Sequence, residues 1–234
     1  MSSAIEDAKR AVAKHACSLI KDEDYRTIAV GTGTTVRYFI KYLPEYIDVE
    51  KPLFIASSYD TAILLKEIGA KNVEVGIAGK AEVLIDGADE VDKRLNMIKG
   101  GGGAHTREKI LAYLSNRRIY IVDYTKIVEK IGEKHPVPLE VLPYAYNLVL
   151  YSLMKLGFKA RLREGRGKIG PIVTDNGNLI IDVFTGPIDD PYKLHRVLKD
   201  IPGVIETGIF TGIECEVYVG YSKDMVKKFT KSRN

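Results

Sequence analysis

The stretch RTIAVGTGTTVRYFIKYL (Arg26–Leu43) joins a short apolar run, a glycine-rich turn and a segment with helical spacing. The run RTIAV has the composition of a strand buried on both faces, and the glycines permit the sharp turn into a helix. Similar apolar runs recur along the chain, in PLFIASS, NVEVGI, AEVLIDG and RIYIVD. Because these runs alternate with helical patterns, they predict an open, mostly parallel α/β sheet with helices on both faces.

The spacing of apolar residues predicts four helices in this part of the chain. The first covers Ala4–Ile20, and the others lie in VRYFIKYL, YDTAILLKEIGA and AHTREKILAYLSN. Asp60 is the expected N-cap of the helix in YDTAILLKEIGA, and Gly69 is its expected end.

The pattern changes near EKHPVPLEVLP (Glu133–Pro143), where prolines cluster. Beyond it, helical segments (YAYNLVLYSLMKLG, DPYKLHRVLKDIPG) mix with strand-like ones (FKARLRE, VIETGIF), and DNGN predicts a hairpin within PIVTDNGNLIIDVF. This mixture is typical of a small antiparallel sheet with helices on one face. We therefore expect a Rossmann-like domain in residues 1–130 and 207–234, to which CEVYVGYS returns, and a smaller α+β domain of the ferredoxin-like kind in residues 131–206.

The composition narrows the classes of function. The 234 residues include 35 basic and 31 acidic ones, a net charge of +4, and the charges are scattered. This slight excess suits a small anionic ligand, whereas nucleic-acid-binding domains concentrate basic residues on one face. Two cysteines almost a chain length apart fit reduced thiols in a cytosolic protein. No stretch approaches 18 uninterrupted apolar residues, so we expect a cytoplasmic protein that binds neither membranes nor nucleic acid.

GTGTT (Gly31–Thr35) is the first candidate ligand site. Backbone N–H groups and the positive end of the helix dipole at a helix N-terminus favour a phosphate group. A dinucleotide fingerprint would need a third glycine where Val36 stands and an acidic residue where the next strand ends in two serines. The hydroxyls of Thr34 and Thr35 suit a single phosphate group, and an ordinary strand–helix turn is the alternative.

DGADEVD (Asp86–Asp92) places two carboxylates, Asp86 and Asp89, after the strand AEVLI. Ligands of open α/β sheets bind at the carboxyl ends of the strands, and Asp-Gly permits a turn that directs both carboxylates into one cleft. Paired carboxylates perform acid–base chemistry or hold a hard cation, and a solvated acidic turn is the remaining alternative.

MIKGGGGAHTREK (Met97–Lys109) contains four consecutive glycines, which cost backbone entropy on folding. Such a run lets a ligand approach the main chain closely, with Lys99 at one end and Glu108 in the first turn of the following helix. It is not a nucleotide P-loop, since no Gly-Lys-Ser/Thr follows. Taken singly, Lys99 could be a solvated side chain and Glu108 a partner of the helix dipole, but neither alternative explains the glycines.

Other common site patterns are absent from the sequence. The four histidines, at positions 15, 105, 135 and 195, are too dispersed for a metal-ligand motif, and there is no Gly-x-Ser-x-Gly nucleophile elbow. His105 borders the glycine run, where a structural role is the simpler interpretation. The sequence therefore predicts no metal site.

Taken together and in this order, GTGTT, DGADEVD and KGGGGAHTREKI resemble the type A family of ribose-5-phosphate isomerases. The resemblance extends through PLEVLP, VTDNGN and IPGV, and so covers nearly the whole chain. It implies interconversion of ribose 5-phosphate and ribulose 5-phosphate through an enediol in the non-oxidative pentose phosphate pathway, with no metal or organic cofactor. It also implies a homodimer or homotetramer, with the smaller domain in oligomerisation. His105 is a departure, because an apolar residue is commoner there.

The resemblance assigns roles to residues. It implies that Glu108 moves the proton between C2 and C1, and that Asp86 assists ring opening and proton transfer at the oxygens. It implies that Lys99, Asp89 and the N–H groups of the glycine run stabilise the enediolate. The implied substrate-binding positions, with the phosphate near Thr34 and Thr35, are Lys9, Thr32, Gly33, Thr34, Thr35, Gly100, Gly101, Gly102, Gly103 and Lys126.

Two other classes of protein use a similar cleft. A non-catalytic sugar-phosphate sensor could bind without Glu108, but it would usually carry a DNA-binding or partner segment, which this sequence does not show. An amino-sugar phosphate isomerase/deaminase would be expected to lack the combination of Asp86, Lys99 and Glu108. We therefore favour the isomerase.

Overall fold

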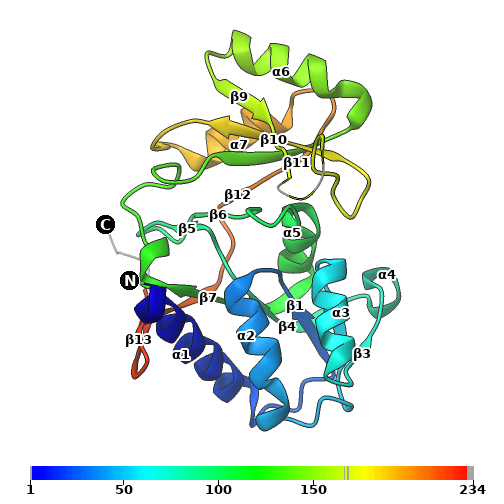
Figure 1. The fold of residues 1–234 in the computed structure, drawn as a ribbon, viewed down its shortest axis with the longest axis vertical. Coiled ribbons are helices and arrows are strands. Elements are labelled where there is room, and N and C mark those ends of the chain that lie inside the picture. The colour runs from blue at the N-terminus through cyan, green and yellow to red at the C-terminus, as the bar shows by residue number, and fades with distance from the viewer. Residues whose placement is uncertain (1, 166, 168, 231–234) are drawn as a thin grey trace. The chain divides into compact units, whose positions relative to one another are not determined.

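The computed structural model describes residues 2–165, 167 and 169–230. The chain forms two compact units, whose elements are drawn in Figure 1. The first unit comprises residues 1–88, 107–127 and 213–234, and the second comprises 89–106 and 128–212. No helix of the described residues has the length and apolar character to cross a membrane.

The first unit is built on a seven-stranded sheet in the order β14-β13-β7-β4-β1-β2-β3. Neighbouring strands are parallel except for the antiparallel pair β13–β14. The strands are β1 (Thr27–Val30), β2 (Leu53–Ala56), β3 (Lys71–Asn72), β4 (Ala81–Asp86), β7 (Ser115–Asp123), β13 (Glu216–Ser222) and β14 (Met225–Phe229). The helices are α1 (Ser2–Ile20), α2 (Thr34–Tyr42), α3 (Tyr59–Glu67), α4 (Val75–Ala78) and α5 (His105–Leu114), with 3-10 turns η1 (Leu43–Glu45) and η2 (Tyr124–Lys126).

The central strands of this sheet are buried on both faces. Ile28, Ala29 and Val30 of β1 are all buried in succession, although side chains along a strand alternate between its faces. On one face, Ile28 and Val30 join a core that includes residues of α1 and α2. On the other face, Arg118 of β7 donates a hydrogen bond to the carbonyl of Ala112 in α5. The prediction of a mostly parallel sheet with helices on both faces is confirmed.

The second unit contains a four-stranded antiparallel sheet, β11-β8-β10-β9, and a three-stranded one, β12-β6-β5. Its elements are β5 (Glu90–Val91), β6 (Met97–Ile98), β8 (Val137–Val141), η3 (Pro143–Ala145), α6 (Tyr146–Lys155), β9 (Lys159–Leu162), β10 (Leu179–Phe184), α7 (Pro191–Lys199), β11 (Val204–Thr207) and β12 (Ile209–Phe210). Leu139 of β8, Val149 of α6 and Leu198 of α7 share one core, so both helices cover the same face of the larger sheet. The predicted small antiparallel sheet with helices on one face is confirmed.

Two local predictions in the first unit need correction. Ser58, rather than Asp60, is the N-cap of α3, because its extended backbone lets its side chain accept a hydrogen bond from the N–H of Thr61 at 3.1 Å. NVEVGI is not a strand: only Lys71–Asn72 pair with β2, and the chain then forms the short helix α4. Gly69 does end α3, with a φ of 84°.

One prediction in the second unit also needs correction, and one strand of this unit was not predicted. The hairpin expected around DNGN is reduced to an isolated bridge between Val173 and Leu179, although the turn itself forms, with the Gly177 N–H donating to the Thr174 carbonyl at 2.9 Å. VPLEV, which lies within the proline-rich segment Glu133–Pro143, is β8, an inner strand of the four-stranded sheet. Prolines usually argue against an inner strand, so the sequence pattern concealed it.

The units differ from the expected domains mainly in one segment. Residues 89–106 belong to the second unit, because β5 and β6 pair with each other and β6 pairs with β12, in a sheet separate from the large one. The segment CEVYVGYS does return to the large sheet, where β13 lies parallel to β7.

Candidate active site

In the first unit, residues that were predicted for the ligand site lie at the carboxyl ends of three parallel strands. β1 leads into Gly31–Thr35, β4 ends in Asp86, and β7 is followed by η2, which ends in Lys126. Because β7, β4 and β1 are parallel neighbours, these residues lie at one edge of the sheet. This is the edge at which open α/β sheets bind their ligands.

Asp86 is fully buried, and backbone N–H groups hold its carboxylate. Its Oδ1 accepts hydrogen bonds from the N–H of Gly87 at 2.7 Å and the N–H of Thr32 at 3.3 Å. Gly31, directly after the neighbouring strand β1, leaves the space for it, since a Cβ there would lie 1.7 Å from Oδ1. Glycine at position 31 is therefore required by the close approach of a carboxylate, which the sequence did not reveal.

A cluster of hydroxyl groups surrounds Thr32. Its Oγ1 lies 2.7 Å from the Oγ atoms of both Ser57 and Ser58, and 3.2 Å from Oγ1 of Thr61. The two serines follow β2, and Thr61 lies in the first turn of α3. Only Thr32 of this cluster was predicted from the sequence, although two serines at a strand end were a visible signal.

The N-terminus of α2 follows directly on this cluster. Gly33 is its N-cap, with a φ of 133°, and the first turn contains no acidic residue. The positive end of the helix dipole is therefore not neutralised from within the helix. Thr34 is exposed and Thr35 is buried. This geometry suits an anion, in line with the prediction from GTGTT.

Lys9 lies near the same edge of the sheet as Lys126. Gly220 of β13 lies beside the end of β7, and a Cβ on it would be 2.1 Å from the carbonyl oxygen of Ala8. Helix α1 therefore passes the carboxyl end of β7 one residue before Lys9. The Nζ of Lys9 pairs with Oε1 of Glu6 at 2.9 Å, one turn earlier in the helix.

Glu108 lies in the first turn of α5 and is 4% exposed. Tyr120, a fully buried residue of β7, pairs in register with Asp86 of β4. Burial, together with the nearby carboxylates of Asp86 and Glu108, raises the pKa of Tyr120 well above its usual value. Its hydroxyl therefore stays protonated. Tyr120 was not predicted from the sequence, because a tyrosine in the apolar run RIYIVD carries no signal until the strand register is known.

In the second unit, Lys99 follows β6 and is 2% exposed. Its N–H donates to the carbonyl of Gly208 at 2.9 Å, and its Nζ lies 5.5 Å from the centre of the Phe210 ring. An ammonium group over an aromatic face is stabilised by the negative potential of the ring. The alternative of a solvated lysine is therefore wrong: a buried cation stands at the start of the glycine run.

The glycine run forms a tight turn in which the N–H of Gly103 donates to the carbonyl of Gly100 at 3.0 Å. Gly100 has a φ of 106°, and a Cβ on it would come within 2.7 Å of Nδ1 of His105. Asp89 accepts a hydrogen bond from the N–H of Gly101 at 2.7 Å, so its carboxylate orders the loop. His105 is fully buried beneath the turn, as expected of a structural residue.

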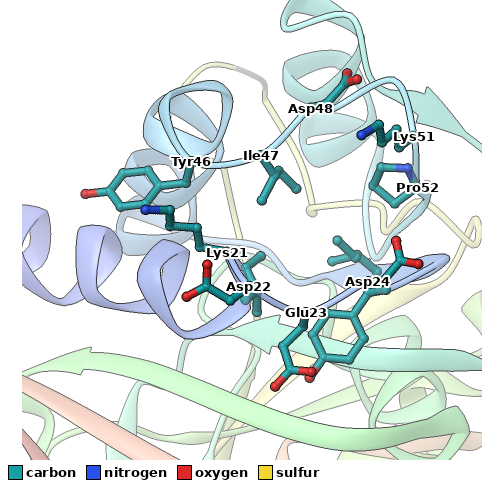
Figure 2. Close-up of a pocket in the computed structure, with 12 residues that line it drawn as sticks. Lys21, Asp22, Glu23, Asp24, Tyr46, Ile47, Asp48, Lys51 and Pro52 are labelled. Carbon is teal, nitrogen blue, oxygen red and sulfur yellow. The ribbon is translucent and has the colours of Figure 1, made fainter.

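A pocket of about 330 Å³ lies at the opposite edge of the large sheet, where residues 20–25 and 46–52 precede β1 and β2 (Figure 2). Its wall carries both acidic and basic side chains, Asp22 and Lys51 among them. This edge holds none of the predicted site residues. Elsewhere, the described part of the chain contains no group of three or more His, Cys, Asp or Glu side chains that could hold a metal ion.

Known proteins resemble this chain in sequence. The family profile described as Ribose 5-phosphate isomerase A (phosphoriboisomerase A) matches residues 53–224. The ribose-5-phosphate isomerase A of Methanococcus vannielii is 41% identical over 229 residues, which are 95% of this chain and 94% of the relative.

Solved structures share the fold over almost the full length. Ribose 5-phosphate isomerase A from Methanocaldococcus jannaschii is 42% identical, with a TM-score of 0.89 over 97% of this chain and 99% of that one. A D-ribose-5-phosphate isomerase in complex with phospho-erythronic acid is 41% identical, with a TM-score of 0.90 over the same shares. Since sequence and fold agree along nearly the whole chain, it belongs to the ribose 5-phosphate isomerase A family.

Proposed function

We propose that this chain interconverts D-ribose 5-phosphate and D-ribulose 5-phosphate, as an aldose–ketose isomerase of the non-oxidative pentose phosphate pathway. The observation that carries the proposal is the 41% identity to a ribose-5-phosphate isomerase A over 95% of the chain, combined with burial of both charged groups that flank the glycine run. A base and a cation withdrawn from water are what proton abstraction beside a carbonyl requires.

The reaction begins with opening of the furanose ring, in which Asp86 assists proton transfer at the sugar oxygens. Glu108, as a carboxylate, then removes the proton from C2 of the open-chain aldose. The electron pair of that bond forms the C1–C2 double bond, and the carbonyl oxygen O1 becomes an enediolate oxygen. The proton returns from Glu108 to C1, while O2 loses its proton and O1 gains one, which yields the ketose.

Negative charge develops on the sugar oxygens as the C2 proton leaves. We assign its stabilisation to the ammonium of Lys99 and to N–H donors of Gly100–Gly103, while the carboxylate of Asp89 holds the loop through the N–H of Gly101. Preorganised donors at such a position contribute strongly, since the loss of one typically costs about 100- to 1000-fold in rate. A relative has been solved with phospho-erythronic acid, whose carboxylate and phosphate groups match an enediolate and a sugar phosphate in charge.

The phosphate group of the substrate is assigned to the N-terminus of α2. Thr34 and Thr35 supply hydroxyl and N–H donors there, and Thr32 and Gly33 complete the turn. Lys9 and Lys126 add positive charge near the same edge of the sheet. A phosphate held away from the reacting carbons orients the sugar and so lowers the entropic part of the barrier.

We further propose that the enzyme uses no metal ion or organic cofactor and works in the cytoplasm. There the thiols of Cys17 and Cys215, which form no disulfide, would stay reduced. The enzyme assembles as a homodimer or homotetramer, with residues 131–206 in the oligomer contact. Light scattering of the purified protein measures the mass of the assembly and so distinguishes a dimer from a tetramer.

The test is turnover of ribose 5-phosphate by the purified chain in the presence of EDTA, with deuterium uptake from D2O as a second readout of proton abstraction. For Glu108→Gln we expect kcat to fall by at least about 100-fold with little change in KM, the range of general acid–base catalysis. Glu140→Gln is the matched control, since Glu140 is an equally buried carboxylate that accepts a hydrogen bond from Thr174 at 2.8 Å.

The outcomes separate the alternatives. Binding of ribose 5-phosphate without turnover by the wild type would favour the sugar-phosphate sensor. Full activity of Glu108→Gln would remove the base assignment and leave the reaction standing. Loss of activity in EDTA that Mg²⁺ restores would make Asp86 and Asp89 candidate metal ligands.

A further inference from the structure

The glycine run (Gly100–Gly103) forms a loop, called the glycine loop, which has no side chains that could fix the direction of its N–H groups. Gly101 and Gly102 are exposed, and glycine is the residue with the greatest backbone freedom. A loop whose N–H groups are to meet a developing charge must be ordered before the reaction, since reordering during it would raise the barrier. Contacts from outside the glycine run must therefore supply the order.

Arg163 makes such contacts on the carbonyl side of the loop. Its Nη1 donates hydrogen bonds to the carbonyl oxygen of Gly100 at 2.7 Å and to that of Gly101 at 3.2 Å. Arg163 directly follows β9 and lies 63 residues from Gly100 in the chain. A single guanidinium nitrogen thus bridges two successive peptide groups of the glycine run.

The guanidinium is itself fixed from the other side. Its Nε donates to Oδ2 of Asp182 at 3.0 Å, and its Nη2 bonds to Oδ1 of the same carboxylate. The side chains of Arg163 and Asp182 are only 14% and 7% exposed. The N–H of Arg163 also donates to the carbonyl of Ile180 in β10 at 2.8 Å. The four-stranded sheet therefore sets the position of the guanidinium.

The planarity of the peptide group converts this contact into an orientation of donors. The Gly100–Gly101 and Gly101–Gly102 peptide bonds are trans, so the C=O and the N–H of each unit point in opposite directions. In the Gly100–Gly101 peptide group, Arg163 binds the carbonyl of Gly100 while Asp89 binds the N–H of Gly101. In the Gly101–Gly102 peptide group, the carbonyl of Gly101 faces Arg163, so the N–H of Gly102 is directed away from Arg163.

We propose that Arg163, braced by Asp182, is a positioning residue that presets the donor direction of the glycine loop for the transition state. The inference rests on the proposed isomerase function, because it assigns the loop to the enediolate. An ion pair alone would be weak grounds, since replacing a buried pair by apolar residues is often neutral for stability. Here Nη1 binds the carbonyl groups of the loop, while Nε and Nη2 bind the carboxylate of Asp182. A lysine cannot make both sets of contacts.

The decisive variant is Arg163→Met combined with Asp182→Leu, which removes the pair without leaving one buried charge alone. Arg163→Lys is the conservative companion. The matched control is Arg117→Met combined with Glu216→Leu, an ion pair of the large sheet whose Nε–Oε1 distance is 2.7 Å. Each protein is checked for folding by circular dichroism and thermal unfolding, then assayed with ribose 5-phosphate. Hydrogen exchange at the amide of Gly101 is measured by NMR.

For the Arg163/Asp182 double variant we expect kcat to fall by about 10- to 100-fold, as for a catalytic group misplaced by roughly 1 Å. KM should stay within about threefold, because the contact acts in the transition state. The Gly101 amide should exchange at least about tenfold faster, since its loop opens more readily. Arg163→Lys should recover only part of kcat, and the Arg117/Glu216 control should change neither kcat nor exchange.

A folded double variant that keeps wild-type kcat, or wild-type exchange at Gly101, would overturn the inference. An equal loss of kcat in the Arg117/Glu216 control would also overturn it, since the effect would then be general loss of stability. If the wild type itself does not turn over ribose 5-phosphate, the proposed function fails separately, and exchange at Gly101 alone decides whether Arg163 orders the loop.

Discussion

Replacement of Gly31 by alanine is the most direct test of how the large sheet places Asp86. The new Cβ would lie 1.7 Å from Oδ1, 1.9 Å from Cγ and 2.6 Å from Cβ of Asp86. Because non-bonded heavy atoms settle near 3.5 Å, the carboxylate has to move by roughly 1.5 to 2 Å. At that displacement it loses its hydrogen bonds from the N–H groups of Gly87 and Thr32.

The expected cost follows from those two losses. A hydrogen bond to a charged acceptor contributes about 1.5–3 kcal/mol, and part is regained as the side chain finds new partners, so we expect the free energy of unfolding to fall by about 2–4 kcal/mol. A misplacement of this size at a catalytic group lowers kcat/KM by about 100-fold or more. Gly31→Ala should therefore be folded at 25 °C, less stable and nearly inactive.

Urea unfolding and steady-state kinetics with ribose 5-phosphate measure the two effects. Gly87→Ala is the matched control, because a Cβ there meets its nearest atom at an ordinary 3.8 Å. In a double-mutant cycle with Asp86→Asn, the losses of activity should be far from additive, since both substitutions disable the same carboxylate. Additive losses, or wild-type activity of Gly31→Ala, would refute the steric argument.

Three further predictions concern other groups. Tyr120→Phe removes a protonated hydroxyl beside two carboxylates. Because a nearby O–H donor favours the charged form of a carboxylate, we expect the acid limb of the kcat/KM pH profile to move to higher pH. An unchanged pH profile would contradict this. Burial alone would raise the pKa of Glu216, but hydrogen bonds led by that from Arg117 lower it from 4.5 to about 2. Its ionised form therefore stabilises the fold above about pH 4.5, and this stability is lost as the pH falls towards 2. Glu216→Gln should accordingly lower the free energy of unfolding by about 1–2 kcal/mol at pH 7, allowing for its partial exposure, and by almost nothing near pH 2, as urea titrations at both pH values would show. Prolonged dialysis against EDTA should leave kcat unchanged, and activity that depends on added Mg²⁺ would contradict a metal-free reaction.

Much of the fold was readable in the sequence because its signals are local. Apolar runs such as RTIAV and AEVLIDG are buried on both faces, and their alternation with helical spacing identified the parallel sheet. The strand–glycine–helix order also located the edge of the sheet at which Thr32 and Asp86 lie. Local signals misled where a competing pattern was stronger: prolines concealed β8, and Asp60 stands two residues after the N-cap position of α3, which Ser58 occupies.

The sequence by itself determined most of the element types, the small antiparallel sheet and the motifs of the family, since side-chain periodicity and turn chemistry act over a few residues. Only the tertiary structure decided which distant groups meet. Strand register sets Asp86 between Gly31 and Tyr120, and the pairing of β6 with β12 takes residues 89–106 into the second unit. It also brings Arg163 to the carbonyls of the glycine run from 63 residues away. Such contacts depend on register and close packing across the chain, which no local pattern encodes.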